Sequence, residues 1–165
     1  MDPITRHAEI VADHSIGIEA SDDVLVIATP AAEEFVVAFF EVCGDRGARP
    51  TWQCTSPRAL RAYLTALEGD VETPELELAL IETADAIVFV NGEDNGMELS
   101  DVPPERMSSY QLAQQPMAKI QMGKPWVITQ FATPGAAQEA EMSTDAYAEF
   151  VRNAVNIDWD DQREF

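Results

Sequence analysis

Three uninterrupted apolar runs constrain the fold of this sequence most strongly. They occupy residues 24–28, 86–90 and 126–128. A strand with one face in water alternates apolar and polar residues, and these runs do not alternate. Such strands are buried on both faces, as in a parallel sheet that helices cover on each side. A weaker strand is predicted at residues 50–55.

Helical patterns separate the predicted strands. Apolar residues recur at helical spacing in two sets, which are Phe35, Ala38, Phe39 and Val42, and Tyr147, Phe150, Val151 and Ala154. Further helices are expected over residues 59–67, 76–84 and 105–122, with Pro116 kinking or dividing the last one. The predicted order is helix, strand, helix, strand, helix, helix, strand, helix, strand, helix, helix. This order predicts a single α/β domain over residues 1–165. Its sheet is doubly wound and mostly parallel with helices on both faces, Rossmann-like or flavodoxin-like.

Small polar residues followed by proline mark the predicted helix starts. The polar side chain can accept a free backbone N–H at the N-cap, while proline fits the first helical position. The five pairs are Asp2-Pro3, Thr29-Pro30, Ser56-Pro57, Thr73-Pro74 and Thr133-Pro134.

The charge balance excludes several classes of partner. The chain has 30 acidic and 10 basic residues, a formal net charge of −20, and its only lysines are Lys119 and Lys124. Nucleic acid and anionic membranes would be repelled.

No apolar run approaches the roughly 20 residues that span a bilayer, and the start lacks a secretory signal, which predicts a cytoplasmic protein. The acidity suggests a salt-rich cytoplasm, as in halophilic archaea, or an acidic protein of an ordinary cell.

The cysteines and histidines do not form a zinc-binding pattern. Cys43 and Cys54 are too far apart for a Cys-x-x-Cys pair, and we expect both to be buried, reduced thiols. His7 and His14 lie seven residues apart on one predicted helix, a spacing too long for two ligands of one ion. We therefore expect solvated or hydrogen-bonded surface histidines.

Nucleotide and phosphoacceptor sites are also missing from the expected positions. The turn after the first strand, residues 28–32, contains no glycine that would admit a pyrophosphate, and no Walker motif occurs. A receiver domain needs an aspartate after the third strand, which here ends in Asn91. Residues 91–96 resemble a calcium loop, but Val102 stands where its glutamate should be, so a polar turn is favoured.

The serines and the acidic tail offer no site either. Four serines are candidate nucleophiles by residue type, and none lies in a Gly-x-Ser-x-Gly elbow; they are Ser15, Ser56, Ser108 and Ser143. Ser56 and Ser143 are interpreted as helix caps. The tail acids are interpreted as a solvated face; they are Asp158, Asp160, Asp161 and Glu164. The sequence thus predicts no catalytic, cofactor-binding or metal-binding residue in this chain.

The C-terminal third carries a family resemblance. Residues 126–131, followed by Thr133-Pro134, Ala137-Gln138, Ala140, Met142-Ser143, Tyr147 and Phe150, form the segment that carries it. Supporting segments are residues 13–15, 22–27, 47–50 and 98–102, and Asp158-Trp159. Together they resemble the amino-terminal domain of the thermophilic-type metalloaminopeptidases, the aminopeptidase T and aminopeptidase S family. The likeness extends over essentially the whole chain and departs from the family at His14, Ala132 and Glu141, which are structural positions.

The resemblance implies a function that needs a second domain. The complete enzymes remove N-terminal residues from peptides, using two divalent metal ions held by glutamates, histidines, a tyrosine and an aspartate. Those ligands belong to a domain beyond the position of Phe165, so none is assigned to a residue here. We expect a scaffold domain without the catalytic metal site, inactive alone, that acts on peptide substrates through the missing domain. Contacts in a homodimer are a further expectation. The alternative is a free-standing, non-enzymatic α/β interaction module.

Overall fold

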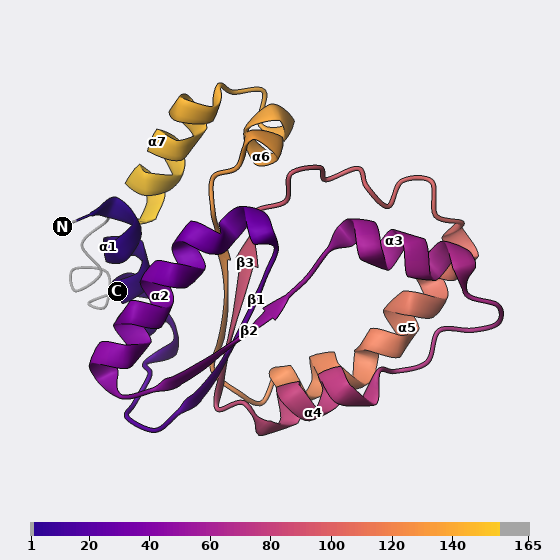
Figure 1. Cartoon of the computed structure of the whole chain (residues 1–165), viewed down its shortest axis with the longest axis horizontal. Helices are drawn as coiled ribbons and strands as arrows, with labels where there is room; N and C mark the ends of the chain where they lie inside the picture. The colour runs from indigo at the N-terminus through magenta and orange to yellow at the C-terminus, as the bar shows by residue number, and fades with distance from the viewer. Residues whose placement is uncertain (1, 156–165) are drawn as a thin grey trace.

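The computed structural model describes residues 2–155 and has the predicted order of helices and strands (Figure 1). The strands are β1 (Asp23–Ala28), β2 (Arg49–Cys54), β3 (Ala86–Asn91) and β4 (Trp126–Gln130). The α-helices are α1 (Pro3–Ile10), α2 (Glu33–Arg46), α3 (Pro57–Ala66), α4 (Glu75–Thr83), α5 (Pro104–Gln121), α6 (Pro134–Glu139) and α7 (Thr144–Val155). A π-helical turn, η1 (Val11–Ile16), and a 3-10 turn, η2 (Pro30–Ala32), complete the elements.

The four strands form one parallel sheet in the order β2-β1-β3-β4. Their register pairs Val24 with both Pro50 and Ala86, and Ile87 with Trp126, so all carboxyl ends lie at the same edge. The chain leaves β1 towards β2 on one side and later returns to place β3 on the other side. This change of direction is the mark of a doubly wound fold, and the predicted fold class is confirmed.

The larger hydrophobic core lies between one face of the sheet and helices α1 and α2. Side chains at alternate positions of β1 and β3, such as Val26 and Val88, are buried against Phe35 and Phe39 of α2. Phe35 and Phe39 stack with ring centroids 6.0 Å apart. The core forms because non-alternating strands present apolar residues to both faces, and the face towards α2 is the more completely covered.

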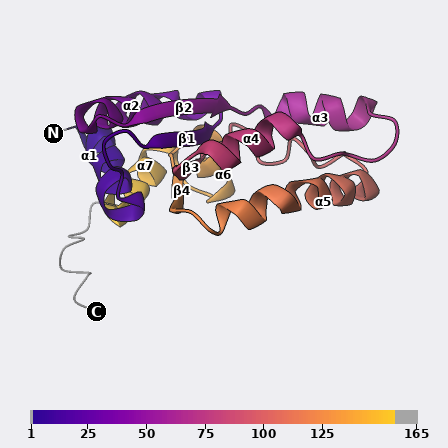
Figure 2. The same cartoon turned by 90° about the horizontal axis from the view of Figure 1, so that it is seen from below.

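The opposite face carries a smaller core beneath α4 and α5. Leu25 and Ile87 of the sheet pack there with Ile81 of α4 and Met117 of α5. Helices α3 and α5 extend well beyond the strands, which gives the molecule an elongated outline (Figures 1 and 2). Ile27 and Phe89 on this face are only partly buried, so the sheet is covered less fully here than on the face towards α2.

Three of the five predicted N-caps act as caps. Asp2 accepts from the amides of Ile4 and Thr5, Ser56 accepts from Ala59, and Thr133 accepts from Ala136. Thr29 and Thr73 do not cap with their side chains. The Thr29 hydroxyl instead donates to the carbonyl of Gly92, and the Thr73 hydroxyl donates to the carbonyl of Ala113. In both cases the threonine hydroxyl bonds to a carbonyl group that is distant in the sequence, and it does not accept a backbone amide of the following helix.

The helix pattern agrees with the sequence except at a few details. α5 is one uninterrupted helix with Pro116 inside it, so Pro116 does not divide it. α2 continues through Gly44 and ends at Gly47, whose left-handed conformation (φ 73°) caps the helix.

No helix among the described residues is long and apolar enough to cross a membrane. The acidic tail lies outside the described residues.

Two predictions about side-chain exposure are wrong. His7 is buried, and its Nε2 lies 2.6 Å from the hydroxyl oxygen of Thr129 on β4, while its ring meets Phe35 edge-on. The helix that was expected to carry both histidines changes to a π turn at Val11, which places His14 on a different element. Cys43 is buried as expected, but Cys54 at the end of the edge strand β2 is exposed. Both cysteines are free thiols.

Candidate functional site

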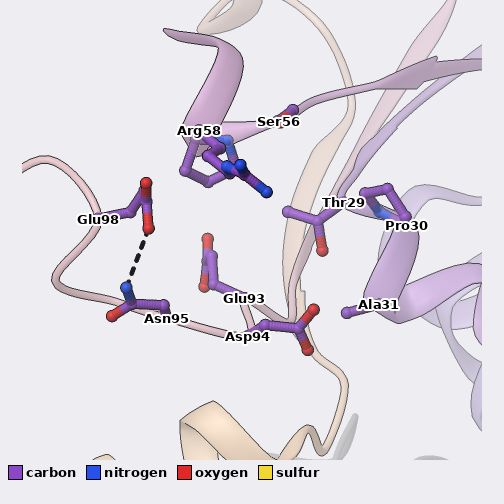
Figure 3. A pocket seen from close by; sticks show the side chains of 10 residues that line it. Thr29, Pro30, Ala31, Ser56, Arg58, Glu93, Asp94, Asn95 and Glu98 are labelled. Carbon is purple, nitrogen blue, oxygen red and sulfur yellow. Dashed lines mark hydrogen bonds between the residues drawn. The ribbon is translucent and has the colours of Figure 1, made fainter. Parts of the chain in front are cut away.

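A crevice opens at the carboxyl ends of β1 and β3, where the strand order changes direction. Doubly wound sheets bind their ligands at this position because the loops diverge there. The cavity has a volume of about 220 Å³ and is bounded by the turn after β1, the start of α3 and the loop after β3 (Figure 3). Its lining residues are Thr29, Pro30, Ala31, Ser56, Pro57, Arg58, Glu93, Asp94, Asn95 and Glu98.

Two buried threonines hold the loops around this crevice in place. Thr29 Oγ1 donates to the carbonyl of Gly92 over 2.7 Å and so joins the turn after β1 to the loop after β3. Thr133 Oγ1 donates to the carbonyl of Glu93, also over 2.7 Å, and accepts from Ala136. The segments after β1 and β4 are therefore both fixed to the loop after β3.

The start of α6 packs directly on the loop that forms the crevice floor. A Cβ built on Gly135 would lie 2.3 Å from the carbonyl oxygen of Asp94, which is closer than atoms can approach. Gly92 is also enclosed, since a Cβ there would lie 3.4 Å from each of Ala32, Phe131 and Thr133. Glycine is needed at position 135 because the two backbones meet there without room for a side chain.

The crevice is lined by charges of both signs. Glu93 and Glu98 come from the loop after β3, and Arg58 comes from the first turn of α3 (Figure 3). Asn95 Nδ2 donates to Glu98 Oε2 over 3.0 Å, which orients that carboxylate. The four ion pairs formed among residues 2–155 use Arg6, Arg46, Arg49 and Arg61, so the Arg58 guanidinium is outside all of them. The lining can therefore bind ammonium donors through its carboxylates and an anionic acceptor through Arg58.

The same residues do not fit a pair of metal ions. Each ion of a two-metal centre needs several convergent ligands. Residues 2–155 contain no group of three or more histidine, cysteine, aspartate or glutamate side chains placed to hold a metal ion. One of the two histidines, His7, is buried against Thr129 and does not line the crevice. No catalytic step through a metal ion can be derived from this set of side chains.

The structure brings together residues that the sequence treated separately. Ser56 caps α3 at the rim of the crevice, while Ser143 caps α7 by accepting from Ala146. Ser108 donates to the carbonyl of Pro104 within α5.

Residues 91–96, interpreted as a polar turn, supply Glu93, Asp94 and Asn95 to the crevice. The sequence analysis did not identify Arg58 or Glu98 as site residues. Arg58 follows the end of β2 closely, which is a signal that could have found it, whereas Glu98 lies seven residues beyond the end of β3.

Comparison with protein families gives one match that covers the chain. Residues 2–164 match the family described as thermophilic metalloprotease (M29). A comparison with curated proteins gave no match to this sequence.

Comparison with solved structures supports the fold. Wild-type AmpT from Thermus thermophilus is similar with a TM-score of 0.72 and 20% sequence identity. The match covers 93% of this chain and 42% of that chain, so the chain spans less than half the length of AmpT. A cysteine desulfurase from Thermococcus onnurineus NA1 has a TM-score of 0.37 and 12% identity, covering 82% of this chain and 34% of that one. The latter similarity is too low to inform the fold.

Proposed function

The chain belongs to the thermophilic metalloprotease (M29) family, and from this membership we propose that it is the N-terminal scaffold domain of a metal-dependent aminopeptidase. The observation that carries the proposal is the family match over residues 2–164 combined with a fold that spans only 42% of AmpT. Under this proposal the two divalent ions bind to a part of the enzyme that these residues do not form. The domain supplies a rigid support beside that part.

The crevice suggests how the domain contributes to substrate access. Glu93 and Glu98 present carboxylates at the open carboxyl edge of the sheet, and the whole chain carries a net charge of −20. A negative surface raises the local concentration of positively charged groups, such as the ammonium group at the N-terminus of a peptide. We therefore assign to the crevice the attraction and orientation of peptides, and not the cleavage of a bond.

Activity of the isolated chain tests the missing metal site. The 165-residue protein is expected to show no turnover of aminoacyl-p-nitroanilides in the presence of cobalt or zinc, because its described residues provide no convergent ligand set. A full two-domain aminopeptidase of the same family serves as the positive control under the same salt. Metal-dependent turnover by the isolated chain would contradict the proposal.

A free-standing interaction module is the second candidate, since the same fold serves unrelated functions. The DNA that follows the codon of Phe165 separates the two candidates. A continuation, in frame or after a frameshift, that is rich in glutamate and histidine is expected for the scaffold domain. A following region that encodes no such segment would favour the interaction module.

We also propose that the domain works in a salt-rich cytoplasm, and its melting temperature is expected to rise between dilute buffer and molar KCl. The chain has thirty acidic residues and only ten basic ones. The excess negative charges repel one another in the folded state. The screening length falls to about 3 Å at 1 M salt, which removes most of this repulsion. Thermal unfolding followed by circular dichroism measures the change. An unchanged melting temperature across this range would count against the proposal.

A further inference from the structure

The crevice at the carboxyl edge of the sheet holds opposite charges apart. Arg58 of α3 lines one side of it, and three carboxylates from the loop after β3 line the other (Figure 3). These carboxylates belong to Glu93, Asp94 and Glu98. None of the four side chains takes part in an ion pair among residues 2–155. The guanidinium group and the carboxylates therefore face a common space without neutralising one another.

Hydrogen bonds fix the side of the crevice that carries the carboxylates. The Thr133 hydroxyl donates to the carbonyl of Glu93 over 2.7 Å. Asn95 Nδ2 donates to Glu98 Oε2, while Asn95 Oδ1 accepts from the amide of Met97. The loop after β3 is thus held both by the segment after β4 and by its own asparagine. This bracing keeps the carboxylates on their own side of the cavity.

Helix α3 fixes the opposite side. Ser56 caps its first turn by accepting from the amide of Ala59. One turn after Arg58, the guanidinium group of Arg61 donates to both carboxylate oxygens of Asp101, which lies in the same loop as the three carboxylates. This ion pair joins α3 to the loop after β3. It therefore holds the two sides of the crevice at a set spacing.

The charge pattern selects the kind of ligand. A simple cation would leave Arg58 without a partner, and a simple anion would face three carboxylates. A molecule with one positive and one negative group can satisfy both sides, because carboxylates accept from an ammonium group and a guanidinium group donates to a carboxylate. None of the described residues that line the crevice carries an aromatic ring, which a quaternary ammonium group would need. The positive group is therefore one that carries N–H donors.

The size of the crevice limits the ligand to a small molecule. Its volume is about 220 Å³. Cavities for drug-sized ligands are larger, at roughly 300–1,000 Å³. An α-amino acid carries an ammonium and a carboxylate group on one carbon atom, so it places both charges within such a small space.

A second cavity adjoins the crevice and can receive a side chain. The two cavities share four lining residues, which are Thr29, Ser56, Pro57 and Glu93. The second cavity has a volume of about 410 Å³ and adds, among others, the apolar surfaces of Leu60, Leu99 and Tyr110. Burial of an apolar side chain against such surfaces is favourable. The two cavities together therefore match an amino acid such as leucine better than glycine.

We propose that the crevice binds a free α-amino acid as a zwitterion, with its carboxylate on Arg58, its ammonium group on Glu93 and Glu98, and its side chain in the second cavity. The inference rests on the proposed function for the source of this ligand, because a full-length aminopeptidase releases free amino acids. The N-terminus of a peptide offers the ammonium group but has no carboxylate beside it. The released amino acid therefore occupies the crevice in preference to a peptide and limits the attraction of further peptides as product accumulates.

An NMR titration of the ¹⁵N-labelled 165-residue protein with L-leucine tests the proposal. The titrations are run at one KCl concentration at which circular dichroism shows that the protein is folded. Leucine is expected to shift the amide signals of residues 93–98 and of the first turn of α3 in a saturable way. Glycine is expected to bind about tenfold more weakly, since it cannot fill the second cavity. A titration in which leucine leaves these signals unchanged would overturn the proposal.

Two blocked forms of leucine test whether both charges are recognised. N-acetyl-L-leucine lacks the ammonium group and L-leucinamide lacks the carboxylate. Each is expected to bind more weakly than leucine by about tenfold or more, since each loses a charge-assisted hydrogen bond. Either blocked form binding as tightly as leucine would contradict a zwitterion site. If that form were leucinamide, the proposed attraction of peptide N-termini would still stand.

Substitutions in the crevice test the assignment of its residues. Arg58→Gln and Glu93→Gln are each expected to weaken leucine binding by about tenfold or more. Arg6→Gln on α1 and Glu41→Gln on α2 are the matched controls, because these residues lie outside both cavities, and they are expected to leave binding unchanged. Circular dichroism checks that all four variants fold. Equal effects of crevice and control variants would contradict the assignment.

Binding and catalysis are measured separately in these experiments. A protein that binds no leucine would overturn the amino-acid site and leave the proposed scaffold function in place. Metal-dependent turnover by the isolated chain would contradict the scaffold function, whatever the result of the titrations.

Discussion

Replacement of Phe35 by alanine is expected to lower the free energy of unfolding by about 3–5 kcal/mol. Phe35 is fully buried at the centre of the larger core, where its ring contacts those of His7 and Phe39. The substitution removes the apolar contacts of a whole aromatic ring and leaves a cavity that the close-packed sheet and helices cannot fill. Chemical denaturation in molar KCl measures the loss, because salt removes the separate effect of charge repulsion.

Val37→Ala is the matched control for this substitution. Val37 lies on the same helix two residues further along, and its side chain is exposed. Its replacement is expected to change the free energy of unfolding by no more than about 0.5 kcal/mol. If Phe35→Ala cost as little as Val37→Ala, then α2 would not pack on the sheet as described.

The free energy of unfolding is expected to fall by about 3 kcal/mol, through His7 alone, as the pH is lowered from neutral to about 4. Burial lowers the pKa of His7 from 6.5 to about 4, because the charged ring would lose its hydration beside Phe35. The unfolded chain then binds more protons than the folded chain between these two pH values. The stability due to neutral His7 is therefore complete above pH 6.5 and is lost as the pH falls towards 4.

A His7→Gln variant isolates this contribution from the many carboxylates. Glutamine has no charge to gain and can still form a hydrogen bond with Thr129. The difference in unfolding free energy between the two proteins is expected to change by about 3 kcal/mol across this window, with the native protein losing more at low pH. Urea denaturation at several pH values measures the difference, and an NMR titration of the His7 ring measures its pKa. A difference that does not vary with pH would contradict burial of His7.

The fold could be predicted because its signals are local. An uninterrupted run such as residues 86–90 predicts a strand buried on both faces, and Phe35 and Phe39 mark the buried side of α2 by their spacing. Caps at Asp2 and Ser56 depend on amides two or three residues away. Family membership likewise follows from the order of residues along the chain.

The candidate site could be predicted only in part. The sequence predicts a polar turn over residues 91–96; in the structure Asn91 is the last residue of β3, and Glu93, Asp94 and Asn95 of the loop after it line the crevice. The sequence did not predict that Arg58 lines the same crevice as these residues. Arg58 belongs to the first turn of α3, where the sequence pattern predicts only a helix cap. Arg58 follows β2 along the chain and Glu93 follows β3, and β1 lies between these two strands in the sheet. A sequence pattern marks the ends of strands but does not state which ends are neighbours.

Apolar spacing and local hydrogen bonding already specify which segments are helices and strands, and that the sheet is parallel and doubly wound. The partners of Thr29 and His7, in contrast, follow only from the packed chain. Thr29 bonds to a carbonyl 63 residues away, and His7 bonds to a hydroxyl 122 residues away. A hydroxyl or an imidazole takes whichever partner the packed strands place within reach, and the strand order, which brings those partners together, is set by the whole chain at once.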